Sequence, residues 1–164
     1  MSKGGEMNQK FPQKHNNVFR GRYIHSIDGK GRLSIPNHFR EVLKRKYKEE
    51  GIMLTSLGVS LVAYPLAEWS VIEEKVSKLP QIKPEVRKFQ LLFISGAVEC
   101  TFDKQGRILV PPALREHAGL KKDVIIAGML NKFEIWDKGR WEKEMKLLTE
   151  NFEEISNVIA DLGL

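Results

Sequence analysis

An aspartate followed four positions later by an arginine can form a carboxylate–guanidinium pair, and this sequence contains the arrangement twice. Asp28 and Arg32 make the first copy, and Asp103 and Arg107 make the second. An arginine presents several N–H donors in one plane, which suits a carboxylate, a phosphate or the edge of a guanine base. The residues alone leave two interpretations open: the pair is a clamp that closes a turn, or the arginine contacts a ligand.

Other potentially reactive side chains show no such organisation. Cys100 is the only cysteine, and it shares one face of a predicted strand with Val98 and Phe102, so we expect a core thiol and no nucleophile. The four histidines lack the spacing of a metal site, and no glycine-rich segment matches a P-loop or a dinucleotide-binding motif. We therefore predict no enzymatic activity, metal, cofactor or small-molecule ligand, with an enzyme as a remote alternative.

The Asp–Arg pairs lie inside an internal repeat with an offset of 75 residues. The offset also matches Gly31 with Gly106 and Arg40 with Arg115, and apolar residues match apolar residues between these positions. Alternating side chains predict that each copy is two strands joined by a tight turn, in which glycine permits a positive φ. The residues assigned to the turns are Asp28, Gly31, Asp103 and Gly106.

Helices and further strands complete each copy. In the first copy Asn37 is expected to cap a helix, strands follow at 53–56 and 60–64, and Pro65 opens a second helix. A third helix is predicted over 85–95. In the second copy the corresponding helix and strands are predicted at 113–117, 123–127 and 132–136.

The positive charge is concentrated near the N-terminus. The chain has a net charge of +6, but residues 1–48 contain 12 Lys and Arg against 3 Asp and Glu, whereas residues 49–164 contain 15 against 18. A basic lobe on an otherwise acidic chain is typical of a protein that binds a polyanion. A merely solubilising surface is the alternative.

Composition places the chain among globular proteins, with 41% hydrophobic and 29% charged residues. Its apolar runs are far shorter than the roughly 20 residues of a membrane-spanning helix. Residues 1–18 are interpreted as a mobile basic leader without the apolar segment of a secretion signal. A single cysteine fits a reducing compartment, so we expect a cytoplasmic protein without a membrane partner.

From Trp141 onward the sequence predicts one long helix. Its apolar residues are spaced alternately by four and three positions, which is a heptad stripe. A helix lying on its own domain and an exposed seam between subunits both produce such a stripe, and both stay open. The stripe consists of Trp141, Met145, Leu148, Phe152, Ile155, Ile159 and Leu162.

Several motifs follow one another in a specific order along residues 19–141. They occupy residues 19–21, 25–36, 96–99, 103–112 and 133–137. Together they resemble the MraZ family, bacterial transcriptional regulators of the division and cell-wall gene cluster. The resemblance implies two SpoVT/AbrB-type domains in one chain, forming a mostly β fold with flanking helices (α+β), in which swapped hairpins close a barrel as an intrachain pseudo-dimer.

The resemblance also implies a function and a set of contacts. In that family the motif arginine is held to touch DNA, which points to Arg32 first and Arg107 second. The first copy surrounds its arginine with Arg20, Arg22 and Lys30, whereas the second has uncharged residues at the matching positions, so we interpret the first copy as the binding face. Double-stranded DNA and a ring-like homo-oligomer of the chain itself are the expected partners.

Such a regulator would be nucleoid-associated, would act on its own gene among others, and would bind short direct repeats as an oligomer. A structural ring without a DNA role is the alternative. The expected division of the chain is a leader at 1–18, a first SpoVT/AbrB-like repeat at 19–80, a linker and helix at 81–96, a second repeat at 97–141 and a C-terminal amphipathic helix at 142–164.

Overall fold

The structure, a computed structural model, describes residues 17–164, so nearly all of the predicted leader lies outside the described residues. The strands are β1 (Arg22–Ser26), β2 (Arg32–Ser34), β3 (Gly51–Leu57), β4 (Ser60–Pro65), β5 (Val98–Thr101), β6 (Arg107–Leu109), β7 (Asp123–Gly128) and β8 (Phe133–Asp137). The α-helices are α2 (Asn37–Val42), α3 (Leu66–Ser77), α4 (Pro84–Phe89), α5 (Pro112–His117), α6 (Lys138–Glu150) and α7 (Phe152–Asp161), and π-helical turns η2 (Leu43–Tyr47) and η3 (Gln90–Ile94) extend α2 and α4.

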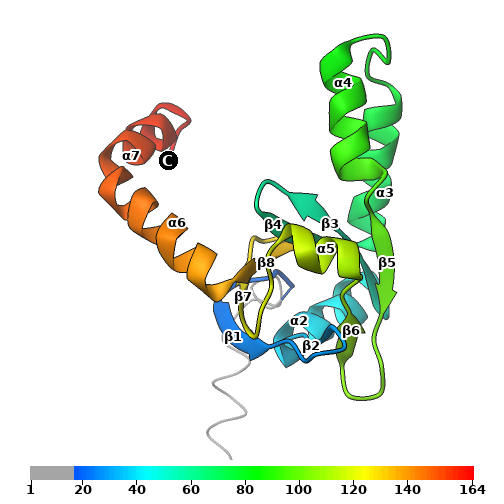
Figure 1. The fold of residues 1–164 in the computed structure, drawn as a ribbon. Helices are drawn as coiled ribbons and strands as arrows, with labels where there is room; N and C mark the ends of the chain where they lie inside the picture. The colour runs from blue at the N-terminus through cyan, green and yellow to red at the C-terminus, as the bar shows by residue number, and fades with distance from the viewer. Residues whose placement is uncertain (1–16) are drawn as a thin grey trace, which may run out of the picture.

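The strands of the two repeats are interleaved (Figure 1). Six strands form one sheet in the order β1-β7-β8-β4-β3-β5, and β2 and β6 form a separate two-stranded ribbon. Every one of these pairings is antiparallel, and β1 of the first repeat pairs with β7 of the second while β5 pairs with β3. The coarse fold class, an antiparallel β structure with flanking helices, is therefore confirmed, and its closure as a swapped-hairpin barrel stays a prediction.

One hydrophobic core serves both repeats. Leu33 and Ile108 face each other across the ribbon and are 0% and 1% exposed. They pack into the same cluster as Phe39 on α2 and Leu114 on α5. Because residues from both copies fill this cluster, neither copy buries its apolar strand faces without the other.

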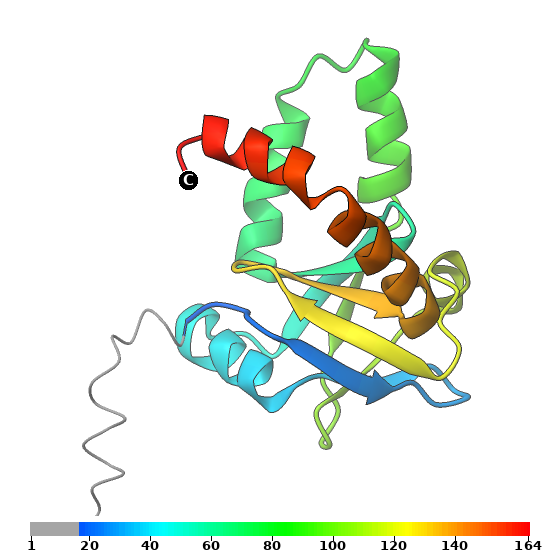
Figure 2. The same cartoon turned by 90° about the vertical axis from the view of Figure 1, so that its left-hand side faces the viewer.

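A smaller core anchors a helical hairpin that projects from the sheet. Helices α3 and α4 stand side by side in both views (Figures 1 and 2). Trp69 of α3 and Phe93 of η3 pack on Tyr64 at the end of β4, and the Thr55 hydroxyl donates a hydrogen bond of 2.6 Å to the Phe93 carbonyl. Leu92, the residue before Phe93, is by contrast 69% exposed.

The prediction of one long C-terminal helix is wrong, because two helices meet at Asn151. This residue has φ −104° and ψ 18°, which breaks the helical path between α6 and α7. Helix α6 is held to the sheet by the edge-to-face contact of Trp141 with Trp136. Every residue from Asn151 to Leu164 is exposed, so α7 does not cover a core of its own domain.

The start of α2 also differs from the prediction. Pro36 occupies the N-cap position, and its carbonyl accepts from the Arg40 backbone N–H at 3.1 Å. Asn37 is the first helical residue, and its side-chain amide reaches Glu41 at 3.4 Å without capping the helix. Proline suits this boundary because its fixed φ, here −50°, favours a helix start. In the part of the chain that the structure describes, none of the helices is long and apolar enough to cross a membrane.

Replacing Gly31 with alanine tests the strain at the first turn. Gly31 has φ +87°, and a Cβ there would lie 2.9 Å from the Val110 carbonyl oxygen. We expect Gly31→Ala to lower the free energy of unfolding by about 1–3 kcal/mol in a denaturant titration. Gly29→Ala is the matched control, since nothing lies within 4 Å of its Cβ position. Equal midpoints for the two variants would contradict the turn geometry.

Candidate nucleic-acid interface

The Asp28 carboxylate organises the first turn. Its Oδ1 accepts from the backbone N–H groups of Lys30 at 3.0 Å and Arg32 at 2.9 Å, and its Oδ2 accepts from Arg32 Nε at 2.6 Å. The backbone closes the same turn, because the Gly31 N–H donates to the Asp28 carbonyl at 3.0 Å. Asp28 therefore fixes both the loop and the plane of the arginine side chain.

The second turn repeats this arrangement. Asp103 Oδ1 accepts from the backbone N–H groups of Gln105 at 2.8 Å and Arg107 at 2.9 Å, and Oδ2 accepts from Arg107 Nε at 2.8 Å. The clamp is therefore present in both copies. Within residues 17–164, however, the terminal amino groups of Arg32 and Arg107 have no hydrogen-bond partner. The clamp and a ligand contact would use different atoms of one guanidinium.

The ribbon places both motif arginines on one face. Arg32 lies opposite Leu109, and Ser34 lies opposite Arg107, while the residue pair between them is buried. Directly opposed residues share a face, so these four side chains all point away from the core. The arginines are diagonal neighbours, which places their Cα atoms about 7–8 Å apart. The second copy thus contributes to the same outer face, although the distribution of charge had pointed to the first copy alone.

Each turn is also held by the other repeat. The Val110 N–H donates to the Gly31 carbonyl at 2.8 Å, and the Ile35 N–H donates to the Gly106 carbonyl at 3.1 Å. These bonds are related by the 75-residue offset, so the ribbon has an approximate two-fold symmetry in its backbone.

Two helical arginines lie beneath the turns of the opposite copy. Arg40 of α2 donates through Nε to the Ile35 carbonyl at 3.2 Å, and its guanidinium fills the space where a Cβ on Gly106 would sit. Arg115 of α5 donates through Nη1 to the Gly29 carbonyl at 3.2 Å. The sequence alignment matched these two arginines but gave them no role. Their recurrence at the repeat offset was the signal that could have indicated one.

Both turn aspartates are held in the charged form. The pKa of Asp28 falls from 3.8 to about 2, chiefly because its carboxylate accepts the Arg32 backbone N–H. Desolvation opposes this effect, whereas the Arg32 side chain and the Lys30 N–H reinforce it. The pKa of Asp103 is lowered by the corresponding groups, with the Arg107 N–H as the largest cause. The clamps are therefore intact at neutral pH.

The remaining predicted contact residues do not gather around Arg32. Lys30 is exposed at the first turn, but Arg22 lies at the far end of β1, where its guanidinium sits 5.2 Å from the ring centre of Trp141. At about 3.3 Å per residue, the strand places Arg22 on the order of 15 Å from the turn. Arg20 precedes the strand and is exposed. The expected cluster of four cations is therefore not formed.

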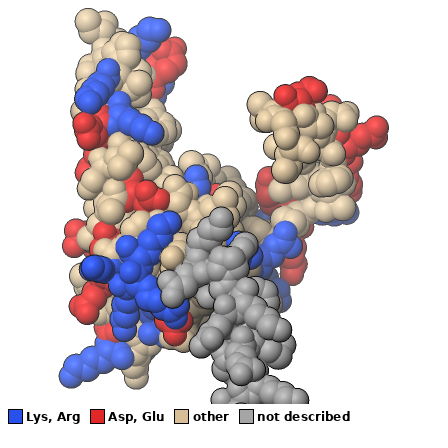
Figure 3. Space-filling view, turned by 180° about the vertical axis from the view of Figure 1, so that it is seen from behind, with Lys and Arg blue, Asp and Glu red and all other residues tan. Residues whose placement is uncertain are grey.

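Cations that the sequence comparison overlooked lie closer to the ribbon. Lys104 is exposed in the second turn, one position before the site that matches Lys30. Lys and Arg also gather below the α3–α4 hairpin, where α2 and η2 lie (Figure 3). The exposed cations of η2 and the residue after it are Lys44, Arg45, Lys46 and Lys48.

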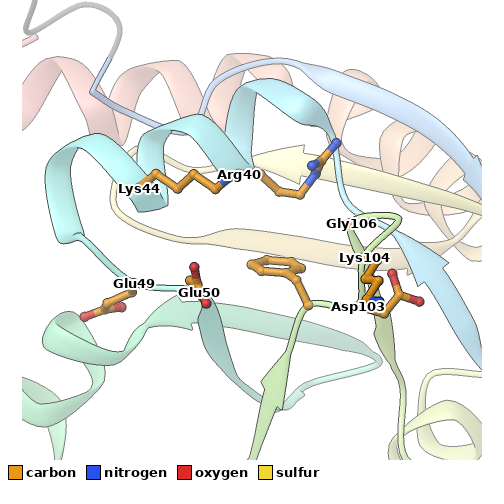
Figure 4. A pocket seen from close by; sticks show the side chains of 8 residues that line it. Arg40, Lys44, Glu49, Glu50, Asp103, Lys104 and Gly106 are labelled. Atoms are coloured by element: carbon orange, nitrogen blue, oxygen red, sulfur yellow. The ribbon is translucent and has the colours of Figure 1, made fainter.

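A pocket of about 180 Å³ connects this basic face with the second turn (Figure 4). Arg40 and Lys44 line one side, and Asp103 and Lys104 line the other. Carboxylates contribute too, but that of Glu49 already caps α3 by accepting the backbone N–H groups of Leu66 and Ala67. No group of three potential metal ligands occurs between residues 17 and 164. The pocket therefore joins two cationic surfaces and is itself of mixed charge.

The fold and the paired turns define a class: a tandem-repeat β protein whose two copies build one arginine-bearing ribbon. The family model described as "MraZ protein, putative antitoxin-like" matches residues 18–92 and 93–160. The chain belongs to the MraZ family, which confirms the resemblance seen in the motifs.

Relatives support the assignment over most of the chain. A protein from Syntrophobacter fumaroxidans is 49% identical over 146 residues, covering 89% of this chain and 97% of the relative. Proteins from Pelotomaculum thermopropionicum and Pediococcus pentosaceus are 45% and 43% identical over 147 residues, covering 90% of this chain and 99% and 100% of the relatives. All three bear the name "Transcriptional regulator MraZ".

The lowered pKa of Asp28 predicts how the first clamp responds to acid. A depressed pKa in the folded state contributes stability that is present above the unfolded value near 3.8 and is lost as pH falls through about 2. We expect the Asp28 carboxyl signal in an NMR titration to shift near pH 2. Asp28→Asn should lose less stability than the parent between pH 4 and 2. A titration of Asp28 near pH 4 would contradict the clamp.

Proposed function

We propose that the chain is a sequence-specific transcriptional regulator that binds double-stranded DNA, acting on the division and cell-wall gene cluster and on its own gene. The observation that carries the proposal is the outer face of the β2–β6 ribbon, where Asp-held Arg32 and Arg107 each keep two terminal amino groups open. A two-stranded ribbon fits the major groove, and an open arginine fork matches guanine O6 and N7. The relatives' printed name supports regulation of transcription by a protein that is not an enzyme.

The proposed contacts fall into two groups. Arg32 and Arg107 contact base edges, because their clamped planes are oriented before DNA arrives and lose little side-chain freedom on binding. Lys30 and Lys104 flank them at the turns and contact phosphates, as do the cations of η2. Arg20 and Arg22 remain in the proposal as phosphate contacts beyond the ribbon, at the far end of β1.

The same proposal covers the organisation and location of the chain. The interleaved pairing of β1 with β7 and of β5 with β3 supports a swapped-hairpin barrel formed by SpoVT/AbrB-like repeats at 19–80 and 97–141. A linker with α4 joins them, and α6 and α7 complete the C-terminus. A regulator of this kind acts in the cytoplasm at the nucleoid.

Assembly of several chains is supported by two complementary surfaces. The arm formed by residues 150–164 carries four acidic residues and no Lys or Arg, and its apolar side chains are exposed. The hairpin segment 75–92 carries five Lys and Arg against one acidic residue, and also exposes apolar side chains. If the arm of one copy binds the hairpin of the next, the contact is head-to-tail. Such contacts form a closed ring when the rotation between neighbouring subunits adds up to a full turn. The exposed apolar residues are Leu79, Ile82, Phe89, Leu91 and Leu92 on the hairpin and Phe152, Ile155, Val158, Ile159, Leu162 and Leu164 on the arm.

Replacing Arg32 tests the binding face. We expect Arg32→Ala to weaken specific binding by about 1–3 kcal/mol, because it removes a base contact. Arg32→Lys should keep the salt dependence of binding but lose sequence discrimination, since lysine retains the charge without the planar fork. Fluorescence anisotropy with DNA from upstream of the gene, at several salt concentrations, measures both effects.

Lys146→Ala is the control for Arg32→Ala, because Lys146 is an exposed cation on α6, outside the ribbon, the hairpin and the arm. Its DNA affinity should equal that of the parent. Unchanged specific binding by Arg32→Ala at equal salt would exclude the ribbon as the DNA contact. Early thermal melting of Arg32→Ala with unchanged affinity for the folded fraction would leave the arginine with only its clamp role.

Removing residues 152–164 tests the assembly. Because α7 is fully exposed, we expect the shortened chain to keep its thermal midpoint but to sediment as smaller species. Multivalency raises the affinity for DNA with several copies of the binding site, or boxes, by roughly 10²–10⁴ over DNA with one box, when the boxes are spaced by one turn of about 10–10.5 base pairs. The shortened chain should lose this gain in affinity. Sedimentation identical to that of the full chain would contradict the arm as a subunit contact.

A further inference from the structure

The ribbon is symmetric in its backbone but not in its outer face. The turn bonds, the Asp–Arg clamps and the two bonds between repeats recur at the 75-residue offset. Arg32 and Arg107 are identical partners under this symmetry. The next outward position, however, is Ser34 in one copy and Leu109 in the other. A duplex that met only the symmetric elements would be bound equally well in both orientations.

Leu109 is an apolar side chain on an otherwise polar face. It is 59% exposed, whereas its neighbours Ile108 and Val110 are each 1% exposed. Its Cδ1 would lie 3.7 Å from a Cβ built on Gly31, so the side chain lies beside the first turn, next to Arg32. The core is complete without it. Leu109 therefore presents an aliphatic surface beside Arg32, on the face that the proposed function places against DNA.

The matching half of the ribbon is polar. The Ser34 hydroxyl lies 2.8 Å from His25 Nδ1, and the same nitrogen lies 2.7 Å from the Ser34 carbonyl oxygen. In the other half Cys100 replaces the histidine, and its Sγ lies 3.8 Å from the Leu109 carbonyl oxygen. Arg107 thus lies opposite Ser34, which contacts His25, whereas Arg32 lies opposite Leu109.

Base edges in the major groove present one apolar group, the C5-methyl of thymine. We propose that Leu109 contacts the methyl group of a thymine adjacent to the base contacted by Arg32, and that the difference between Leu109 and Ser34 sets the orientation of the ribbon on its DNA. The inference rests on the proposed DNA-binding function and names the residue that makes its site asymmetric. Each ribbon then reads a non-palindromic box, and neighbouring subunits that point the same way read direct repeats.

A selection from a randomised pool of DNA duplexes tests the orientation. Full-length protein should enrich an asymmetric box containing a thymine. Leu109→Ser makes the two halves of the outer face alike, so it should enrich a box close to a palindrome. Leu147→Ser is the control, because Leu147 is similarly exposed, at 55%, but lies on α6; it should enrich the parent box.

Replacing thymine by deoxyuridine in the enriched box tests the methyl contact directly. Removing one buried methyl should weaken binding of the parent protein about three- to fivefold for each box. Leu109→Ala should bind both DNAs equally. Circular dichroism and sedimentation of each Leu109 variant establish that the fold and assembly are those of the parent.

The outcomes separate this inference from the function on which it rests. If the parent enriches no sequence, the DNA-binding proposal fails and the orientation proposal fails with it. If the parent enriches a box but Leu109→Ser enriches the same one, or if Leu109→Ala keeps the thymine preference, only the role of Leu109 is overturned. A Leu109 variant that changes assembly size with unaltered base preference also overturns it, and assigns the leucine to a subunit contact.

Discussion

Two backbone hydrogen bonds between the repeats constrain the whole structure: Val110 N–H to the Gly31 carbonyl and Ile35 N–H to the Gly106 carbonyl. Each lies where a turn meets the other copy's strand, which leaves no room for a Cβ at Gly31. A ribbon of three residue pairs is too short to be stable by itself. It persists because the Leu33–Ile108 pair beneath it belongs to the common core. The outer face of the ribbon exists only when both copies fold together.

The turns and strands could be predicted from the sequence because they depend on local pattern. Asp28 and Gly31 specify the turn chemistry, and the period-2 alternation specifies which side is buried. The partner of each strand could not be predicted, because alternation is the same whether a strand pairs within its own repeat or with the other. The break at Asn151 was missed for a related reason: the apolar stripe runs through it without interruption, so spacing alone indicated one helix.

The candidate site could be predicted only where it depends on local sequence, and not where it depends on long-range strand pairing. Arg32 and Arg107 were identified from the repeat, but their meeting on one ribbon depends on long-range pairing. Arg22 belonged to the expected cluster because it is near in sequence, yet an extended strand carries it away from the turn. Lys104 was overlooked because the comparison was made position by position, and the second turn carries its lysine one residue earlier. Both turns expose a lysine, although the two lysines do not occupy matching positions of the repeat.

Interleaving also has a consequence for the order in which the protein can form. Tyr23 of β1 pairs with Ile126 of β7, so the first strand made has no partner until about 100 further residues have been synthesised. At about 5–20 residues per second this delay is on the order of 5–20 s, during which β1 is an unpaired strand edge. A nascent chain interrupted anywhere before β7 lacks the neighbour of β1. β1 can therefore join the sheet only late, after β7 of the second repeat has been synthesised.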